Sequence, residues 1–285
     1  MIEKLFHLKK NNTNARTEVI AGLTTFMTMA YILAVNPTML SAAGMDSTAV
    51  LIATCLASFV GTMAMALLAN YPFALAPGMG LNAYFAYTVV IGMGYTWQYA
   101  LTAVFAEGII FILLSLTNVR EAIFNAIPMN LKSAVSVGIG LFIAFVGLQN
   151  AHIVVGGSTL LQLFSVDAYN KANGVEASFN NVGITVILAL AGIIITGILV
   201  VKNIKGNILW GILITWALGI ICQFAGLYVP NADLGFYSLL PDFSKGLSIP
   251  SLTPIFGKLQ FKGIFSVDFI VILFAFLFVD LFDTI

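Results

Sequence analysis

The stretch PFALAPGMGLNAYFAY, residues Pro72–Tyr87, combines the apolar composition of a membrane span with a Pro-Gly-Met-Gly sequence at its centre. Pro77 lacks a backbone N–H and clashes with the preceding helical turn, whereas Gly78 and Gly80 tolerate non-helical backbone dihedrals. Backbone that is not helical occurs at membrane depth only where protein buries it or where it lines a cavity. We therefore predict that residues Pro77–Asn82 are not a continuous helix and that they face the protein interior.

The composition places the chain in a membrane. Of its 285 residues, 60% are hydrophobic and 8% are charged, and the mean hydropathy is +1.02, whereas soluble domains carry about 25% charged residues. Lys and Arg together number 12, as do Asp and Glu, so the basic face that a nucleic-acid-binding protein needs is not expected. The predicted fold class is an all-α polytopic membrane protein.

Eight apolar stretches approach the length of about 20 residues that a membrane span requires. They cover residues 19–40, 49–69, 72–91, 97–116, 133–149, 183–201, 207–227 and 267–285. Between the fourth and the fifth, residues 117–134 are typical of a short amphipathic segment at the membrane interface. The last stretch ends in FLFVDLFDTI without a polar flank, so we interpret residues 1–285 as a fragment of a longer membrane domain.

The placement of Lys and Arg predicts the orientation of the chain, because cytoplasmic segments carry an excess of both. With the N-terminus inside, eight of these residues are cytoplasmic: Lys4, Lys9, Lys10, Arg16, Arg120, Lys132, Lys202 and Lys205. Four lie outside: Lys171, Lys245, Lys258 and Lys262. We expect a multi-pass protein of the cell membrane whose N-terminus is cytoplasmic.

No metal site, disulfide or cofactor is expected. Cys55 and Cys222 lie in apolar runs, where buried small hydrophobic residues are the usual interpretation, and His7 and His152 lie far apart. The sequence also lacks a nucleotide-binding motif such as a P-loop, so ATP hydrolysis by this chain is not supported.

The break within residues 72–91 has two interpretations. Many secondary transporters use broken helices to expose backbone donors and acceptors to a substrate, whereas a proline kink with small-residue packing is common in membrane helices. Asn82 favours the first, because its amide offers donors and an acceptor beside the break. Gly80 and Leu81 are candidate substrate-binding residues together with Asn82.

Four further polar residues lie in apolar spans. Asp280 and Asp283 are three residues apart and so share one face of the last helix. Carboxylates inside a span are costly and usually functional, although either could simply bond to a helix terminus or a hydroxyl group. Glu107 can equally be a packing contact between domains or a site residue. Asn36 precedes Pro37, and we expect this proline to end the first helix.

Four stretches resemble the AzgA-like purine permeases, a branch of the nucleobase–cation symporters related to the uracil and xanthine permeases. In chain order they are TTFMTMAYILAVNPTML, ALAPGMGLNAYFAY, AVFAEGIIFILLSLTNVREAIFNAIP and FLFVDLFDT. The resemblance implies fourteen spans in two inverted repeats of seven, divided into a core and a gate domain, with spans three and ten broken. This chain would hold the first repeat and most of span eight, and the second repeat would be missing.

The resemblance also implies a function. Asn82 matches the binding asparagine of span three, and Asp283 matches the acidic position of span eight. An amide can pair with the edge of a purine, as Asn and Gln do with adenine, and a buried carboxyl group can take up a proton. We expect uptake of hypoxanthine or guanine, or else adenine or xanthine, by proton symport through alternating access, with Asp283 and Asp280 in proton coupling.

The expected partners are therefore the purine nucleobase, the proton and the lipid bilayer, and a homodimer is a further expectation. A channel would need pore-lining rings or a filter, and another small-solute secondary transporter would use the same broken helix. An intramembrane aspartyl protease needs two carboxylates that face each other across helices, whereas Asp280 and Asp283 share one helix. No enzymatic activity is expected, and the sequence does not decide which purine is preferred.

Overall fold

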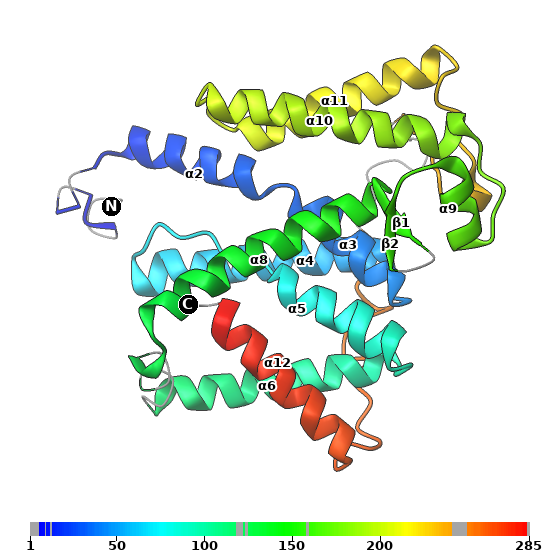
Figure 1. Cartoon of the computed structure of the whole chain (residues 1–285). Helices are drawn as coiled ribbons and strands as arrows, with labels where there is room; N and C mark the ends of the chain where they lie inside the picture. The colour runs from blue at the N-terminus through cyan, green and yellow to red at the C-terminus, as the bar shows by residue number, and fades with distance from the viewer. Residues whose placement is uncertain are drawn as a thin grey trace. The chain divides into compact units, whose positions relative to one another are not determined.

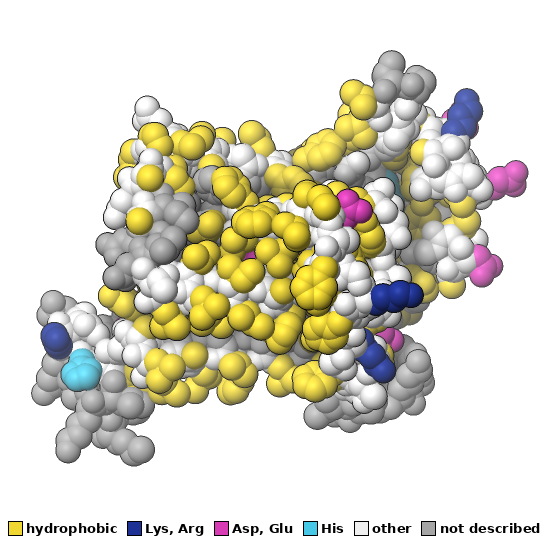
Figure 2. All heavy atoms as spheres, turned by 90° about the horizontal axis from the view of Figure 1, so that it is seen from below, with side chains coloured by type: hydrophobic (Ala, Val, Ile, Leu, Met, Phe, Trp, Pro, Cys, Tyr) yellow, Lys and Arg dark blue, Asp and Glu magenta, His cyan; other side chains and the backbone are white. Residues whose placement is uncertain are grey.

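The computed structural model describes residues 6–8, 10–11, 13–117, 122, 125–157, 160–240 and 250–283, apart from the side chains of Ser136, Phe282 and Asp283. Within this part, six helices are long and apolar enough to cross a membrane, and a shorter apolar helix covers Met79–Gly92. Hydrophobic side chains are spread over much of the face shown in Figure 2, and charged side chains are few on it. The predicted class, an all-α polytopic membrane protein, is confirmed.

The chain divides into two compact units that alternate along the sequence (Figure 1). The first unit comprises residues 1–7, 32–143 and 249–285, and the second comprises residues 8–31 and 144–248. The helix α8 (Met129–Asn150) contributes to both units, because the division falls after residue 143. The expected interfacial segment, residues 117–134, lies partly outside the described residues.

The first unit is built from helices that pack on one another near the broken span. They are α3 (Ile32–Ala42), α4 (Ser47–Ala64) with its π-helical continuation η1 (Met65–Ala69), α5 (Met79–Ala83) with its π-helical continuation η2 (Tyr84–Gly92), α6 (Trp97–Leu116) and α12 (Val267–Asp283). The helix α3 packs on α4 and α5, and α12 packs on α6 and α5. The short helix α5 is therefore held between elements from both ends of the chain.

The second unit joins membrane helices to a folded polar connection. Its elements are α2 (Ala15–Met29), β1 (Val154–Gly156), β2 (Leu161–Leu163), α9 (Val166–Asn173), η3 (Phe179–Gly183), α10 (Ile184–Val201), α11 (Asn207–Phe224) and the 3-10 turn η4 (Ala232–Leu234). The strands β1 and β2 pair antiparallel, with Val155 opposite Gln162. This hairpin lies between the fifth and the sixth expected spans.

Small residues allow α10 and α11 to pack closely. A Cβ atom on Gly192 of α10 would lie 2.6 Å from Oγ1 of Thr215 of α11, and a Cβ atom on Gly211 of α11 would meet Thr196 of α10. Each helix therefore places a glycine opposite a threonine of its neighbour. Such small-residue contacts let helix backbones approach where the bilayer supplies no hydrophobic force between them.

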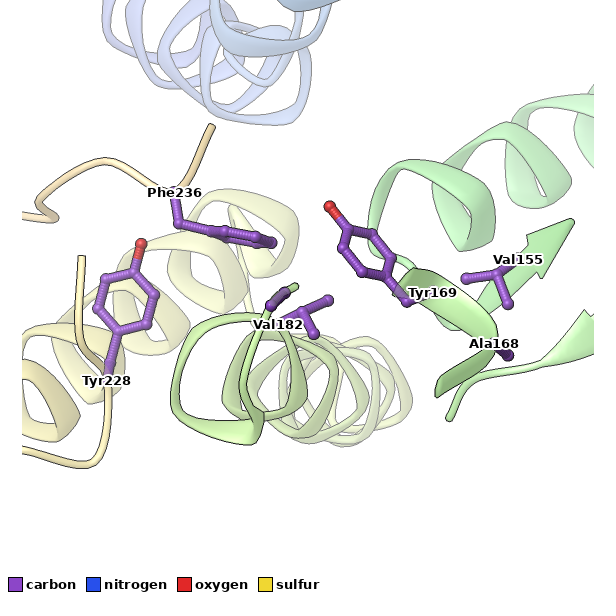
Figure 3. Packing of buried hydrophobic residues seen from close by; sticks show 7 residues of the cluster. Val155, Ala168, Tyr169, Val182, Tyr228 and Phe236 are labelled. Atoms are coloured by element: carbon purple, nitrogen blue, oxygen red, sulfur yellow. The ribbon is translucent and has the colours of Figure 1, made fainter. Parts of the chain in front are cut away.

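The polar connection of the second unit has an aromatic core, shown in Figure 3. Tyr169, Tyr228 and Phe236 are buried there, and the Tyr228 hydroxyl donates to the Tyr237 carbonyl at 2.7 Å. The ring of His152 packs against Tyr169, with 4.9 Å between ring centroids. Burial lowers the pKa of His152 below its usual value, since an imidazolium loses hydration in this core.

Two expected spans are interrupted, and both contain a proline. The first span breaks at residues 30–31, between α2 and α3, and Pro37 lies inside α3. The prediction that Pro37 ends the helix is therefore wrong. In the third span, residues 70–78 are not helical, and the helix begins at Met79 after Gly78 with φ −71° and ψ 129°.

The prediction that residues Pro77–Asn82 are not a continuous helix is confirmed. Pro77 and Gly78 are non-helical, whereas Gly80, Leu81 and Asn82 belong to α5. Proline disturbs the turn before it rather than the turn after it. The helix can therefore resume directly after Gly78.

Candidate functional site

Three polar side chains from three helices meet in the first unit. The Nδ2 atom of Asn82 on α5 donates to Oδ1 of Asn36 on α3 at 2.6 Å. The Nδ2 atom of Asn36 donates to Oγ1 of Thr54 on α4 at 2.7 Å. Asn36 and Thr54 are 3% and 2% exposed, whereas Asn82 is only partly buried. We call this series the amide relay.

The relay is anchored on the backbone of α4. The hydroxyl of Thr54 donates to the carbonyl oxygen of Val50, one turn earlier, at 2.8 Å. This bond is the common way in which a threonine satisfies its hydroxyl group inside a helix. The relay therefore runs from a fixed backbone acceptor to a side chain that is partly open.

The non-helical stretch before α5 is held against α4. The backbone N–H of Leu75 donates to Oγ1 of Thr62 at 3.0 Å, and that hydroxyl donates to the Leu75 carbonyl at 3.3 Å. A Cβ atom on Gly61 would lie 3.4 Å from Cβ of Leu75, so the glycine leaves space for this approach. Thr62 thus satisfies both backbone polar groups of Leu75 within the non-helical stretch.

Two acidic residues interact where α6 and α12 pack together. Glu107 on α6 is 4% exposed, and its Oε1 atom has no hydrogen-bond partner among the described residues. The charge of Asp280 on α12 acts on Glu107. Glu107 therefore lies within reach of the charge of Asp280 where α12 packs on α6, whereas the sequence interpretation treated Glu107 as equally a packing contact between domains.

The helix α12 also packs on the broken span. Phe276 is fully buried, and its ring meets the ring of Tyr84 edge-on, with 5.1 Å between centroids. Asp280 lies one helical turn after Phe276 and so shares that face of α12. The backbone of α12 extends to Asp283, but the side chain of Asp283 lies outside the described residues.

Hydrogen bonds hold the start of α12 on the start of α6. The Tyr95 hydroxyl donates to Oδ2 of Asp268 at 2.7 Å, and this bond raises the pKa of Tyr95. The Tyr99 hydroxyl and Oγ of Ser266 lie 3.0 Å apart, and the backbone N–H of Gln260 donates to Thr102 at 2.8 Å. These contacts fix the register of α12 against α6, on which the meeting of Asp280 and Glu107 depends.

Sequence reasoning missed Thr54 and undervalued Asn36. Both lie in apolar runs, and a threonine or asparagine within a span is a weak signal by itself, because such residues often bond within their own helix. The partners of Asn36 lie 18 and 46 residues away, and helical periodicity is not informative at that distance. No group of three His, Cys, Asp or Glu that could hold a metal occurs in the described ranges.

Comparison with known proteins adds a family and relatives. The model of the family described as "Permease family" matches residues 16–285. The chain is 47% identical over 284 residues to "Putative permease MJ0326" of Methanocaldococcus jannaschii, covering 99% of this chain and 58% of that protein. It is 43% identical over 283 residues to "Guanine/hypoxanthine permease PbuO" of Bacillus subtilis, covering 98% and 60%.

A third relative carries a different substrate in its name. "Adenine permease AdeP" of Escherichia coli is 36% identical over 285 residues, which cover 100% of this chain and 57% of that protein. The chain thus spans about three fifths of the length of these relatives.

Proposed function

This chain belongs to the Permease family, which confirms the resemblance predicted from its four motifs, and on this premise we propose that it is part of a purine permease. The permease takes up hypoxanthine or guanine by proton symport through alternating access and catalyses no reaction. The relatives named for guanine, hypoxanthine and adenine support a purine substrate. Because the chain spans about three fifths of their length, it supplies part of the transport machinery.

The observation that carries the proposal is the amide relay. It includes a partly exposed amide, Asn82, which lies in the short helix that follows the non-helical stretch of the third span. A hydrogen bond to the buried Asn36 holds this amide. A neutral heteroaromatic base presents donors and acceptors along its edge, which an amide can pair with. Gly80 and Leu81, in the same short helix, are proposed to line the base together with Asn82.

The acidic residues of α12 are proposed to couple transport to protons. Asp280 interacts with Glu107, which is buried with one carboxylate oxygen unpaired among the described residues. Two carboxylates in a low-dielectric environment are costly when both are charged, so one proton shared between them stabilises the pair. Asp283, one turn further along α12, is proposed to contact the base and to exchange this proton.

The two units are proposed to correspond to the two domains of an alternating-access transporter. The first unit carries every candidate site residue and would be part of the core domain, and the second would be part of the gate. In this proposal the chain is the first of two inverted repeats, its N-terminus is cytoplasmic, and a second broken helix completes the site. A homodimer in the cell membrane is part of the same proposal.

Uptake of labelled hypoxanthine by cells that express the full-length protein and lack their own purine uptake tests the function. We expect competition by guanine, and we expect a protonophore to abolish accumulation while replacement of external sodium has little effect. Asp283→Ala should abolish uptake at unchanged membrane expression, because a methyl group can neither accept a ring N–H nor carry a proton. Asp233→Asn, an exposed carboxylate of the second unit, is the matched control.

Two results would contradict the proposal. Wild-type uptake by Asp283→Ala would remove Asp283 from the site, and sodium-driven accumulation that survives the protonophore would overturn the proton coupling. Asn82→Ala should weaken the affinity for the base more than it changes the pH dependence, and Asp283→Asn should do the reverse.

A further inference from the structure

The amide relay has a direction, and the direction determines what Asn82 offers to a ligand. The Val50 carbonyl can only accept, so the single hydroxyl hydrogen of Thr54 is committed to it at 2.8 Å. The oxygen of Thr54 must then accept from Nδ2 of Asn36, which turns Oδ1 of Asn36 toward Asn82. Asn82 must therefore donate through Nδ2, and its Oδ1 atom has no partner among the described residues.

We propose that Asn36 and Thr54 are positioning residues that hold the Asn82 amide in one orientation, so that Asn82 recognises an N–H donor of the base. This inference rests on the proposed function and deepens it. It assigns the acceptor Oδ1 of Asn82 to a ring N–H of the substrate. The second Nδ2 hydrogen stays available for an adjacent acceptor of the base.

Reversing the relay is unfavourable for a local reason. If Asn82 turned its Oδ1 toward Asn36, Asn36 would have to turn as well and offer its own Oδ1 to Thr54. Thr54 would then give its hydrogen to Asn36, and its oxygen would lie 2.8 Å from the Val50 carbonyl oxygen with no hydrogen between them. Two acceptors at this distance repel each other, and buried polar groups without partners are costly.

A free asparagine amide presents its oxygen and its nitrogen with little preference, because the two ends have the same shape. A base with an acceptor opposite Asn82 would then be tolerated by rotation of the amide. The relay removes this freedom, because rotation breaks the bonds of three buried or partly buried side chains together. Selection of a donor at one ring position is the consequence.

Competition of labelled hypoxanthine uptake by hypoxanthines methylated singly at N1, N3, N7 or N9 tests the inference in the full-length protein. In the wild type, the methyl group that replaces the recognised N–H should prevent competition. Asn82→Ala should lose this discrimination. Thr54→Val keeps the shape of the side chain but removes the anchor, and it should weaken the discrimination at the same ring position by about 3- to 10-fold, the scale of one net hydrogen bond.

Three comparisons separate positioning from general stability. Thr54→Ser restores the hydroxyl and should restore the discrimination. Thr38→Val removes an equivalent hydroxyl that bonds to the carbonyl one turn earlier, on exposed α3 surface, and should leave the discrimination intact. In a double-mutant cycle, Thr54→Val should have no further effect in the Asn82→Ala background, because it acts through Asn82.

The inference is overturned if Thr54→Val keeps the wild-type ranking of the methylated bases, or if its effect adds to that of Asn82→Ala. If Thr54→Val does not reach the membrane, Asn36→Ala is measured in the same cycle, with the same two outcomes deciding. If Asn82→Ala itself leaves the ranking unchanged, Asn82 does not read the base, and that part of the proposed function fails with it.

Discussion

Phe276 is the side chain whose removal should most clearly separate the packed face of α12 from its lipid face. It is 0% exposed and meets Tyr84 edge-on, whereas Phe274, two residues earlier on the same helix, is 61% exposed. We predict that Phe276→Ala destabilises the first unit and that Phe274→Ala does not. The two variants make the same chemical change on opposite sides of one helix.

The magnitude follows from the membrane environment. In soluble cores Phe→Ala costs about 3–5 kcal/mol, of which about 2 kcal/mol is the transfer of the ring from water. In a bilayer the helices separate into lipid that is as apolar as the core, so the transfer contribution is largely absent. The lost packing and the lost aromatic contact leave about 1–3 kcal/mol for Phe276→Ala, and Phe274→Ala should stay within about 0.5 kcal/mol.

Thermal unfolding of the purified full-length protein in a mild detergent measures both variants. Since 1 kcal/mol shifts Tm by about 2–4 °C in proteins of 150–250 residues, Phe276→Ala should lower Tm by about 2–12 °C. Hypoxanthine uptake should fall in the same variant, because α12 carries Asp280 and Asp283. Equal losses of Tm in Phe276→Ala and Phe274→Ala would refute the assignment of the buried face.

Two further predictions concern the second unit. Burial lowers the pKa of His152 in the folded state, so unfolding takes up a proton once the pH falls below the unfolded pKa of about 6.5, and the contribution of His152 to stability should be complete above that pH and fall below it. Thermal unfolding between pH 7.5 and pH 5 measures this loss of stability in acid. The loss should be smaller in His152→Asn, because asparagine tolerates the φ of 58° at this position. Gly211→Val should clash with Thr196 and lower the free energy of unfolding by about 1–3 kcal/mol. Gly197→Val, at a position with open space, should lower it less in the same thermal assay. Equal losses in the two variants would contradict close packing of α10 on α11.

The membrane helices could be predicted from the sequence because runs of apolar residues are a local signal. In the third span, the apolar run predicts a membrane segment but not the position at which its helix is interrupted. Pro77 and two glycines predict a break, but its position depends on which turn the proline disturbs, and the helix resumes at Met79. At Pro37 the helix continues through the proline, and the interruption of the first span lies at residues 30–31. Pro77, in contrast, lies within the non-helical stretch of the third span.

The candidate site could be predicted only in part. Asn82 is identified by its place beside the break, since a polar amide at membrane depth needs a partner. The identity of that partner depends on how α3, α4 and α5 pack, and no local pattern connects Asn36 with Asn82 across 46 residues. Glu107 and Asp280 show the same limit, because only the packing of α12 on α6 brings them together. The side chain of Asp283 stays a prediction.

The helix α12 packs on helices that are synthesised much earlier, and this has a consequence for biosynthesis. Tyr84 and Phe276 touch in the finished fold, yet α12 is made about 190 residues after η2, which takes roughly 10–40 seconds at ribosomal speed. Throughout this interval Glu107 and the interrupted third span reside in the bilayer without the helix that later packs on them. A nascent chain that stalls before residue 267 therefore leaves Glu107 without the helix that packs on α6 in the finished fold. Such intermediates should need shielding by the insertion machinery, and they should be recognised by membrane quality-control proteases when synthesis fails.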